Sequence, residues 1–174
     1  VLTSTYHADG EVSYGRGGNP TWTALETALG DLEGGDALVL ASGMAAVSAA
    51  FSLLPHGGTV VVPDAAYNGV MATVADLEAA GAATVRRVDL TDTAAVVAAL
   101  PGADLLWLES PTNPLLEVAD LPTLTAAARE HGVLSVVDNT FATPLLQRPL
   151  ADGADVVVHS VTKYLAGHSD VLLG

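Results

Sequence analysis

Lys163 is the only lysine in the chain, because the other five basic residues are all arginine. It follows a β-branched apolar run, and Ser160 and Thr162 place hydroxyl groups just before it. Desolvation favours the free amine of a lysine, and a free amine attacks an aldehyde to form a Schiff base. The stretch also matches S-x-x-K, but the penicillin-binding enzymes with that motif need a second lysine. The lone lysine therefore indicates Schiff-base chemistry.

Pyridoxal phosphate is the obvious aldehyde for such a lysine. It needs an acid for its pyridinium nitrogen, an aromatic face for its ring and a cradle for its phosphate. Asp138 ends an apolar run, so its carboxylate would emerge at a strand tip, where it can keep the ring nitrogen protonated. Tyr67 follows another predicted strand and can stack on the ring, although a half-buried turn tyrosine would look the same.

The phosphate cradle has its own candidates. Ser42, Gly43 and Met44 lie between a predicted strand and a predicted helix, where a hydroxyl and free backbone N–H groups can bind an anion. Ser160 and Thr162 can add hydrogen bonds. The stretch from Ser42 to Met44 alone also fits an ordinary helix cap. Their combination at predicted strand ends favours a cofactor site.

The elements that must position these residues follow from the pattern of the chain. Short β-branched or leucine-rich runs alternate with longer alanine-rich stretches of helical period, which is typical of a three-layer α/β/α domain with a mostly parallel sheet. The predicted strands are 37–41, 59–63, 84–88, 105–109, 134–138 and 155–160. The predicted helices are 21–33, 44–54, 68–80, 93–100, 121–131 and 144–151. Open sheets of this kind bind ligands at the carboxyl ends of their strands.

Composition narrows the class of partner. The 174 residues are 50% apolar and carry a net charge of −14, which favours a folded domain and disfavours nucleic acid or an anionic membrane. The absence of cysteine excludes disulfides and a cysteine nucleophile, and no signal peptide is seen, so we expect a cytoplasmic protein. The five histidines are scattered and predict no metal site. Neither a dinucleotide fingerprint nor a P-loop is present.

These residues and their neighbours resemble the pyridoxal-phosphate enzymes of cysteine and methionine metabolism, a trans-sulfuration family that includes cystathionine γ-lyase, cystathionine γ-synthase and methionine γ-lyase. The resemblance is closest to cystathionine γ-lyase and runs in the family's order along nearly the whole chain. The matching stretches are YGRGGNPTWTALE (14–26), SGMAA (42–46), Tyr67, ESPTNP (109–114), VVDNTFATPLLQRPL (136–150) and HSVTKYLAGHSD (159–170).

The resemblance implies an aspartate-aminotransferase-like fold, the fold type I of pyridoxal-phosphate enzymes. Residues 21–174 would form most of the large cofactor domain, and residues 1–20 an extended segment that contacts a neighbouring subunit. The small C-terminal domain of the family, with its arginine for the substrate carboxylate, has no counterpart in the chain. A homodimer or homotetramer is implied.

The resemblance also implies residue roles. Lys163 would form the Schiff base, Asp138 would bind the pyridinium nitrogen, and Tyr67 would stack on the ring and assist proton transfer. Asn113 would lie near the ring hydroxyl. The residues implied around the phosphate are Ser42, Gly43, Met44, Ser160 and Thr162, together with Tyr14 and Arg16, which would reach the phosphate of a neighbouring subunit.

The implied activity is the α,γ-elimination of cystathionine to cysteine, 2-oxobutanoate and ammonia. A γ-synthase or methionine γ-lyase activity is the alternative, the latter less favoured because Gly69 stands where methionine γ-lyases typically have cysteine. A second alternative is a non-catalytic fragment of the cofactor domain. A third, an acidic α/β binding module, leaves the lone lysine unexplained.

Overall fold

The computed structural model describes all residues from Val1 to Gly174. The chain forms two compact units, Val1–Val39 and Leu40–Gly174. Helix α1 (Pro20–Glu33) belongs to the first unit, so the division expected near residue 20 lies inside that unit, and the roles expected for residues 1–20 and 21–174 stay predictions.

The first unit consists of an irregular segment followed by α1. A single antiparallel bridge joins Thr5 to Tyr14 in that segment. α1 begins at Pro20, after Asn19 accepts a hydrogen bond from the N–H of Thr21, and it ends at Gly34 in a left-handed conformation (φ 90°). An asparagine cap, a proline in the first turn and a glycine after the last turn are the usual signals for these ends.

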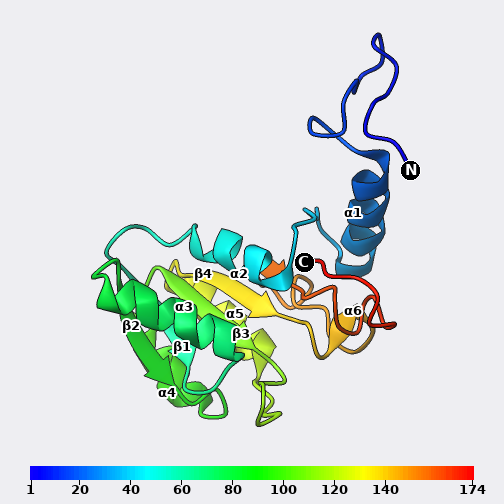
Figure 1. Cartoon of the computed structure of the whole chain (residues 1–174). Coiled ribbons are helices and arrows are strands. Elements are labelled where there is room, and N and C mark those ends of the chain that lie inside the picture. Colours follow the sequence, from blue (N-terminus) through cyan, green and yellow to red (C-terminus); the bar gives the residue numbers. More distant parts are fainter. The chain divides into compact units, whose positions relative to one another are not determined.

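The second unit is built on a five-stranded sheet in which every pair is parallel (Figure 1). The strands are β1 (Gly58–Pro63), β2 (Ala83–Val88), β3 (Leu105–Glu109), β4 (Leu134–Asp138) and β5 (Val156–Val158). Their order across the sheet is β2-β1-β3-β4-β5. The expectation of a parallel α/β sheet is confirmed.

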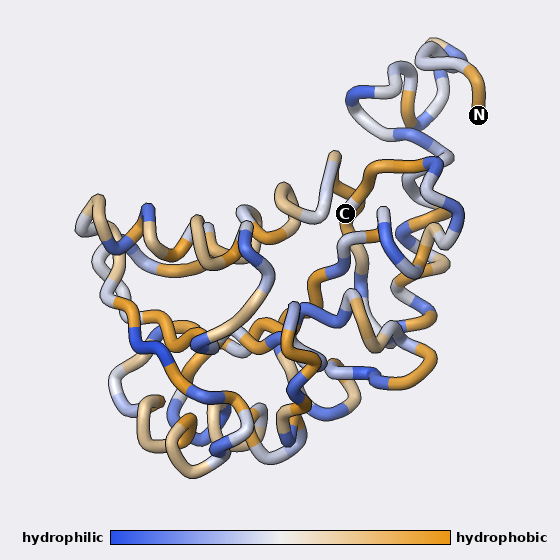
Figure 2. Tube along the Cα trace, turned by 60° about the horizontal axis from the view of Figure 1, so that its bottom comes forward, coloured by the Kyte–Doolittle hydropathy of each residue, from blue (hydrophilic) through white to orange (hydrophobic).

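Helices cover both faces of this sheet. The helices of the second unit are α2 (Gly43–Phe51), α3 (Asn68–Ala79), α4 (Thr93–Ala99), α5 (Leu121–Glu130) and the short α6 (Thr143–Leu146). One core cluster joins α2 and α3 to the sheet through Val60, Val62 and Trp107. The other joins α4 and α5 to it through Val61 and Leu106. Successive side chains of a strand point to opposite faces of the sheet, so each strand contributes to both core clusters and the fold has three layers. In Figure 2 the helices alternate between hydrophobic and hydrophilic colours.

The strand order places a topological switch point between β1 and β3. From β1 the chain passes through α3 to β2 on one side, whereas β3 lies on the other side of β1 and leads through α5 to β4. α3 and α5 pack on opposite faces of the sheet, so the loops after β1 and β3 diverge. Such a switch point, at the carboxyl ends of the strands, is where open α/β sheets bind ligands.

Two predicted elements are wrong. The predicted strand at 37–41 is irregular, because its backbone pairs at one residue only: Leu40 exchanges two hydrogen bonds with Gly174 (2.7 and 3.0 Å). The predicted helix at 144–151 is reduced to α6, since Gln147 is extended and Pro149 disfavours a helical Arg148.

Candidate active site

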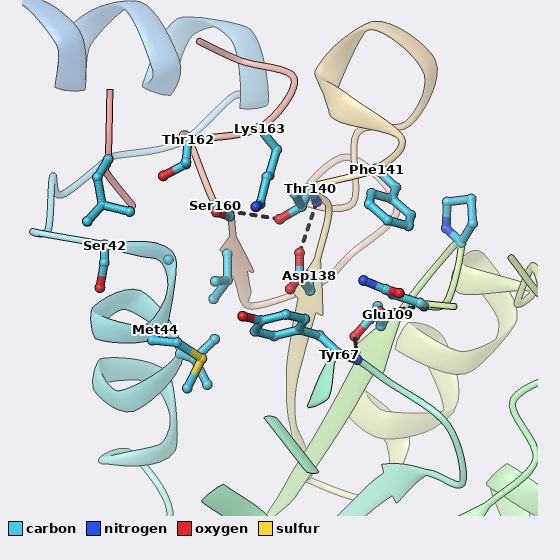
Figure 3. Close-up of a pocket in the computed structure, with 16 residues that line it drawn as sticks. Ser42, Met44, Tyr67, Glu109, Asp138, Thr140, Phe141, Ser160, Thr162 and Lys163 are labelled. Carbon is cyan, nitrogen blue, oxygen red and sulfur yellow. Dashed lines mark hydrogen bonds between the residues drawn. The ribbon is translucent and has the colours of Figure 1, made fainter. Parts of the chain in front are cut away.

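A cavity of about 250 Å³ opens at the carboxyl ends of β1, β3, β4 and β5 (Figure 3). All but two of the predicted site residues line it. They are Ser42, Gly43, Met44, Tyr67, Asn113, Asp138, Ser160, Thr162 and Lys163. The parallel sheet brings together segments that are far apart in the sequence, because the carboxyl ends of its strands share one edge.

Tyr14 and Arg16 are the two that do not line this cavity. Both belong to the first unit, where the Arg16 guanidinium lies 5.4 Å from the centroid of the Tyr14 ring. The cation over the aromatic face is a favourable contact within that unit. Their expected contact with a neighbouring subunit stays a prediction.

Asp138 is the last residue of β4, where its carboxylate faces the cavity. The N–H of Thr140 donates a hydrogen bond to Asp138 Oδ1 (2.9 Å). Burial raises the pKa of Asp138, while hydrogen bonding to Thr140 and the nearby His159 oppose the rise. The Thr140 hydroxyl in turn accepts the N–H of Ser160 (2.9 Å), which ties the end of β4 to the segment after β5.

Lys163 lies in the turns beyond β5, and its side chain extends into the same space as Ser160, Thr140 and Asp138 (Figure 3). It is exposed, so the expectation of a desolvated lysine is wrong for this chain. The reason is local: the backbone bond of Lys163 to Ser160 (3.0 Å) belongs to an open turn at the cavity mouth, outside the packed core. The Tyr67 ring lies across the cavity from it (Figure 3).

The start of α2 forms one wall of the cavity. Ser42 caps the helix by accepting the N–H of Ala45 (3.1 Å), which leaves the N–H groups of Gly43 and Met44 without intrahelical acceptors. Gly43 also lets the helix approach the strand end: a Cβ there would lie 2.7 Å from the Cβ of Ser160. Free N–H groups beside a hydroxyl make this a place for an anion.

Thr162 is less available than the sequence suggests. Its hydroxyl donates to the carbonyl of Leu173 (3.1 Å) and accepts the N–H of the same residue (2.9 Å). Of the two predicted hydroxyls after β5, that of Thr162 is already hydrogen-bonded to Leu173, whereas Ser160 lies close to Gly43 at the start of α2.

Several cavity residues were not predicted from the sequence. They are Glu109, Thr140 and Phe141 together with the apolar Val47, Pro111, Val158 and Leu172. Glu109 is 5% exposed and ends β3. Burial is the main cause that raises its pKa to about 7, and the neighbouring Asp138 raises it further. A strand-end acid in the stretch ESPTNP was the available signal.

Comparison with known proteins identifies the family. The family model described as "Cys/Met metabolism PLP-dependent enzyme" matches residues 2–174. The chain belongs to this family. Pyridoxal phosphate is the cofactor of its members, and the fold is that of the fold type I enzymes, as expected.

Individual relatives agree on the family and differ in activity. The chain is 48% identical to a "Putative cystathionine gamma-lyase" of Streptomyces coelicolor, covering 100% of this chain and 46% of the relative. It is 42% identical to a cystathionine beta-lyase of Bacillus subtilis, covering 98% and 44%. The crystal structure of a cystathionine gamma synthase from Xanthomonas oryzae pv. oryzae with cystathionine superposes with a TM-score of 0.93 at 42% identity, covering 99% and 47%. The chain thus spans about half the length of these relatives.

The cavity fits pyridoxal phosphate. The cofactor carries an aldehyde, a basic ring nitrogen and a phosphate. The chain offers an amine at Lys163, a carboxylate at Asp138 and the open N–H groups of Gly43 and Met44 around the same space. Because Gly43 has no side chain, the start of α2 lies close to Ser160, and a Cβ at this position would fill the space between them.

None of the helices is both long and apolar enough to cross a membrane.

Proposed function

We propose that the chain is the cofactor-binding part of a lyase that acts on sulfur amino acids. The proposed reaction is the α,γ-elimination of cystathionine, in which cystathionine and water give cysteine, 2-oxobutanoate and ammonia. The observation that carries the proposal is the cavity, in which Lys163, Tyr67 and Asp138 meet at the carboxyl ends of three strands. The 48% identical relative supports the γ-lyase among the family's activities.

Each of these residues has a distinct task. Bound pyridoxal phosphate would supply an aldehyde for amines and a ring that withdraws electrons. Lys163 would hold the aldehyde and, once displaced by the substrate amine, would use Nζ to remove the proton from the substrate Cα and then from Cβ. The Asp138 carboxylate would keep the ring nitrogen protonated. The Tyr67 ring would stack on the cofactor ring, and its hydroxyl would assist proton transfer.

The phosphate would bind the start of α2, at the N–H groups of Gly43 and Met44, with the hydroxyls of Ser42, Ser160 and Thr162 around it. Asn113 would lie near the ring hydroxyl. We also propose a cytoplasmic homo-oligomer in which Tyr14 and Arg16 reach the phosphate of a neighbouring subunit. A C-terminal domain would supply the arginine for the substrate carboxylate.

A γ-synthase activity is the second candidate, because the 42% identical structure is a cystathionine gamma synthase. In the synthase reaction, cysteine would combine with an activated homoserine ester to form cystathionine, whereas the lyase would release cysteine from cystathionine. A methionine γ-lyase is less favoured. A Cβ at Gly69 would lie 2.5 Å from Met44 Sδ and 2.7 Å from Tyr67 Cε1, so a larger residue there would require these side chains to move.

The first experiment is to incubate the chain with pyridoxal phosphate, record the visible spectrum, reduce with borohydride and map the modified peptide by mass. A reduced adduct on Lys163 supports the proposal. The Lys163→Ala variant should give no adduct at that position, and mapping separates any reaction at the amine of Val1. A folded chain with no adduct on Lys163 contradicts the proposal.

Turnover of cystathionine separates the activities. Release of 2-oxobutanoate without added cysteine indicates the lyase. Formation of cystathionine from cysteine and an activated homoserine ester indicates the synthase. An adduct on Lys163 with neither reaction indicates a cofactor domain that does not act alone.

A further inference from the structure

Glu109 lies in the wall of the cavity and has no task in the chemistry above. It is the last residue of β3 and is 5% exposed. Each of its carboxylate oxygens accepts one backbone N–H: Oε2 that of Tyr67 (2.9 Å) and Oε1 that of Asn113 (2.7 Å). Figure 3 shows Glu109 beside the backbone of Tyr67. The carboxylate therefore joins two loops that carry cavity residues.

The two loops lie on either side of the switch point. Tyr67 follows β1 and begins α3, whereas Asn113 follows β3, and the chain diverges to opposite faces of the sheet from there. Nothing in the strand ladder holds these loops to each other, because β1 and β3 pair only through Val60 and Val61. Glu109 bridges the gap that the fold leaves open at this edge.

The start of α3 lacks the side-chain cap that the other helices longer than four residues have. α1, α2, α4 and α5 each have a capping side chain, whereas Tyr67 occupies the N-cap of α3 and makes no side-chain cap bond. A tyrosine is an uncommon N-cap. The N–H of this tyrosine is instead held by Glu109, a residue from a different strand.

Only a carboxylate can make both bonds. A glutamine of the same shape has one acceptor oxygen, and its amide group would face the second N–H with another donor. The ionised form is the stronger acceptor. Burial raises the pKa of Glu109 to about 7, so the ionised form predominates only above that pH.

We propose that Glu109 is a positioning residue: its carboxylate fixes the Tyr67 ring and Asn113 relative to each other, and so sets the geometry of the ring-binding side of the cavity. This proposal rests on the proposed cofactor site. Glu109 acts through Tyr67 and Asn113 and takes no proton from the substrate.

The test compares Glu109→Gln with Asp104→Asn. Asp104 lies at the amino end of β3, where its Oδ2 accepts the N–H of Thr59 in β1 (2.7 Å), so it also links β3 to β1. The dissociation constant for pyridoxal phosphate and the visible circular dichroism of the bound cofactor are measured for each variant. We expect E109Q to bind about tenfold more weakly, with an altered dichroic band. D104N should match the wild type in both, even where its unfolding midpoint falls.

A second measurement needs neither a variant nor the cofactor. Amide hydrogen exchange of Tyr67 and Asn113 in the wild type is compared with that of Thr59, after correction for intrinsic rates. The protection of Tyr67 and Asn113 should fall as the pH is lowered through about 7, because Glu109 becomes protonated in that range. The titratable groups that share its cavity are Asp138 on β4, Tyr67 before α3 and Lys163 beyond β5.

The outcomes separate this proposal from the proposed function. An E109Q variant with wild-type affinity and dichroism overturns the positioning role, as does unchanged protection of Tyr67 and Asn113 across that pH range. Absence of an adduct on wild-type Lys163 overturns the proposed function instead, and the exchange measurement still decides the role of Glu109.

Discussion

Carboxylates accept backbone N–H groups at both ends of the parallel strands. The amino ends of the strands form the amino edge of the sheet, and the carboxyl ends form the carboxyl edge. At the amino edge, Asp104 accepts the N–H of Thr59, and Asp155 Oδ2 accepts both the N–H and the hydroxyl of Ser135 (2.8 Å each). At the carboxyl edge, Glu109 and Asp138 likewise accept backbone N–H groups. The amino-edge carboxylates are exposed to solvent, whereas burial raises the pKa of both carboxyl-edge groups.

The difference shows what burial adds to a strand-end acid. An exposed carboxylate that accepts a backbone N–H stabilises the strand end by a modest amount. Desolvation disfavours the ionised form of a buried carboxylate, and neighbouring charges or ligands shift its pKa. We therefore expect substitutions at the carboxyl edge to change cofactor binding and its pH dependence, and matched substitutions at the amino edge to change stability alone.

The largest effect is expected from Asp138→Asn. The variant keeps the shape and an acceptor for Thr140 but loses the charge that would pair with the pyridinium nitrogen. The affinity for pyridoxal phosphate should fall by roughly two to four orders of magnitude, since removal of one partner from a buried charge pair costs about 3–5 kcal/mol and about 1.4 kcal/mol corresponds to a factor of ten. Titration by absorbance measures it. Asp155→Asn is the control, and an equal loss there would remove the distinction between the edges.

The pH dependence of stability tests the buried carboxylate at Glu109. Because its pKa is about 7 in the folded chain and 4.5 ordinarily, the folded state holds more protons between these values. The free energy of unfolding should therefore fall as the pH rises through this window and level off above it, by about 3 kcal/mol for this group.

Denaturant titrations of the wild type and Glu109→Gln across that window isolate the effect of this group. The difference in unfolding free energy between them should shift by about 3 kcal/mol, with the wild type losing more on the alkaline side. Asp138 is present in both proteins, so only the part of its titration that depends on the Glu109 charge contributes to this difference. A difference that does not vary with pH would mean that burial does not raise the pKa of Glu109.

Gly43→Ala should have an intermediate effect. The new Cβ would meet Ser160 at 2.7 Å, so the start of α2 must move away from the strand end. We expect roughly 1–3 kcal/mol of lost stability and about tenfold weaker cofactor binding. Gly102→Ala at the amino edge is the control. Its Cβ meets nothing within 4 Å, and the left-handed backbone (φ 71°) costs about 1 kcal/mol without touching affinity.

The sequence predicts the sheet and most of the cavity because their signals are local. Apolar runs end at Glu109 and Asp138, and glycine and proline mark the turns, so the carboxyl ends of the strands can be identified. The strand expected at 37–41 fails because a strand depends on its partner, and here only Gly174 pairs with Leu40.

The task of Glu109 had no such local signal. Its partner Tyr67 lies 42 residues earlier in the chain, and their contact depends on β1 and β3 being neighbours. The sequence places Glu109 at the carboxyl end of a strand, but it does not show which backbone N–H groups the carboxylate accepts. The exposure of Lys163 was missed for a related reason, since burial depends on what packs over the turn after β5.

The smallest expected effect compares two hydroxyls that support carboxylates. Thr140 lowers the pKa of Asp138, and its Oγ1 accepts the N–H of Ser160. Thr140→Val keeps the shape and the backbone N–H, so the pKa of Asp138 should rise and more of it be protonated. Cofactor affinity should fall about threefold at neutral pH and further as the pH is lowered.

Ser135→Ala is the matched change at the amino edge, where the Ser135 hydroxyl bonds Asp155 Oδ2 (2.8 Å) and accepts the N–H of Asp155 (3.1 Å). It should lower the unfolding free energy by about 1 kcal/mol and leave the affinity and its pH dependence as in the wild type. If Thr140→Val behaves in the same way, the hydroxyl serves only packing, and the special character of the carboxyl edge resides in the carboxylates Glu109 and Asp138 themselves.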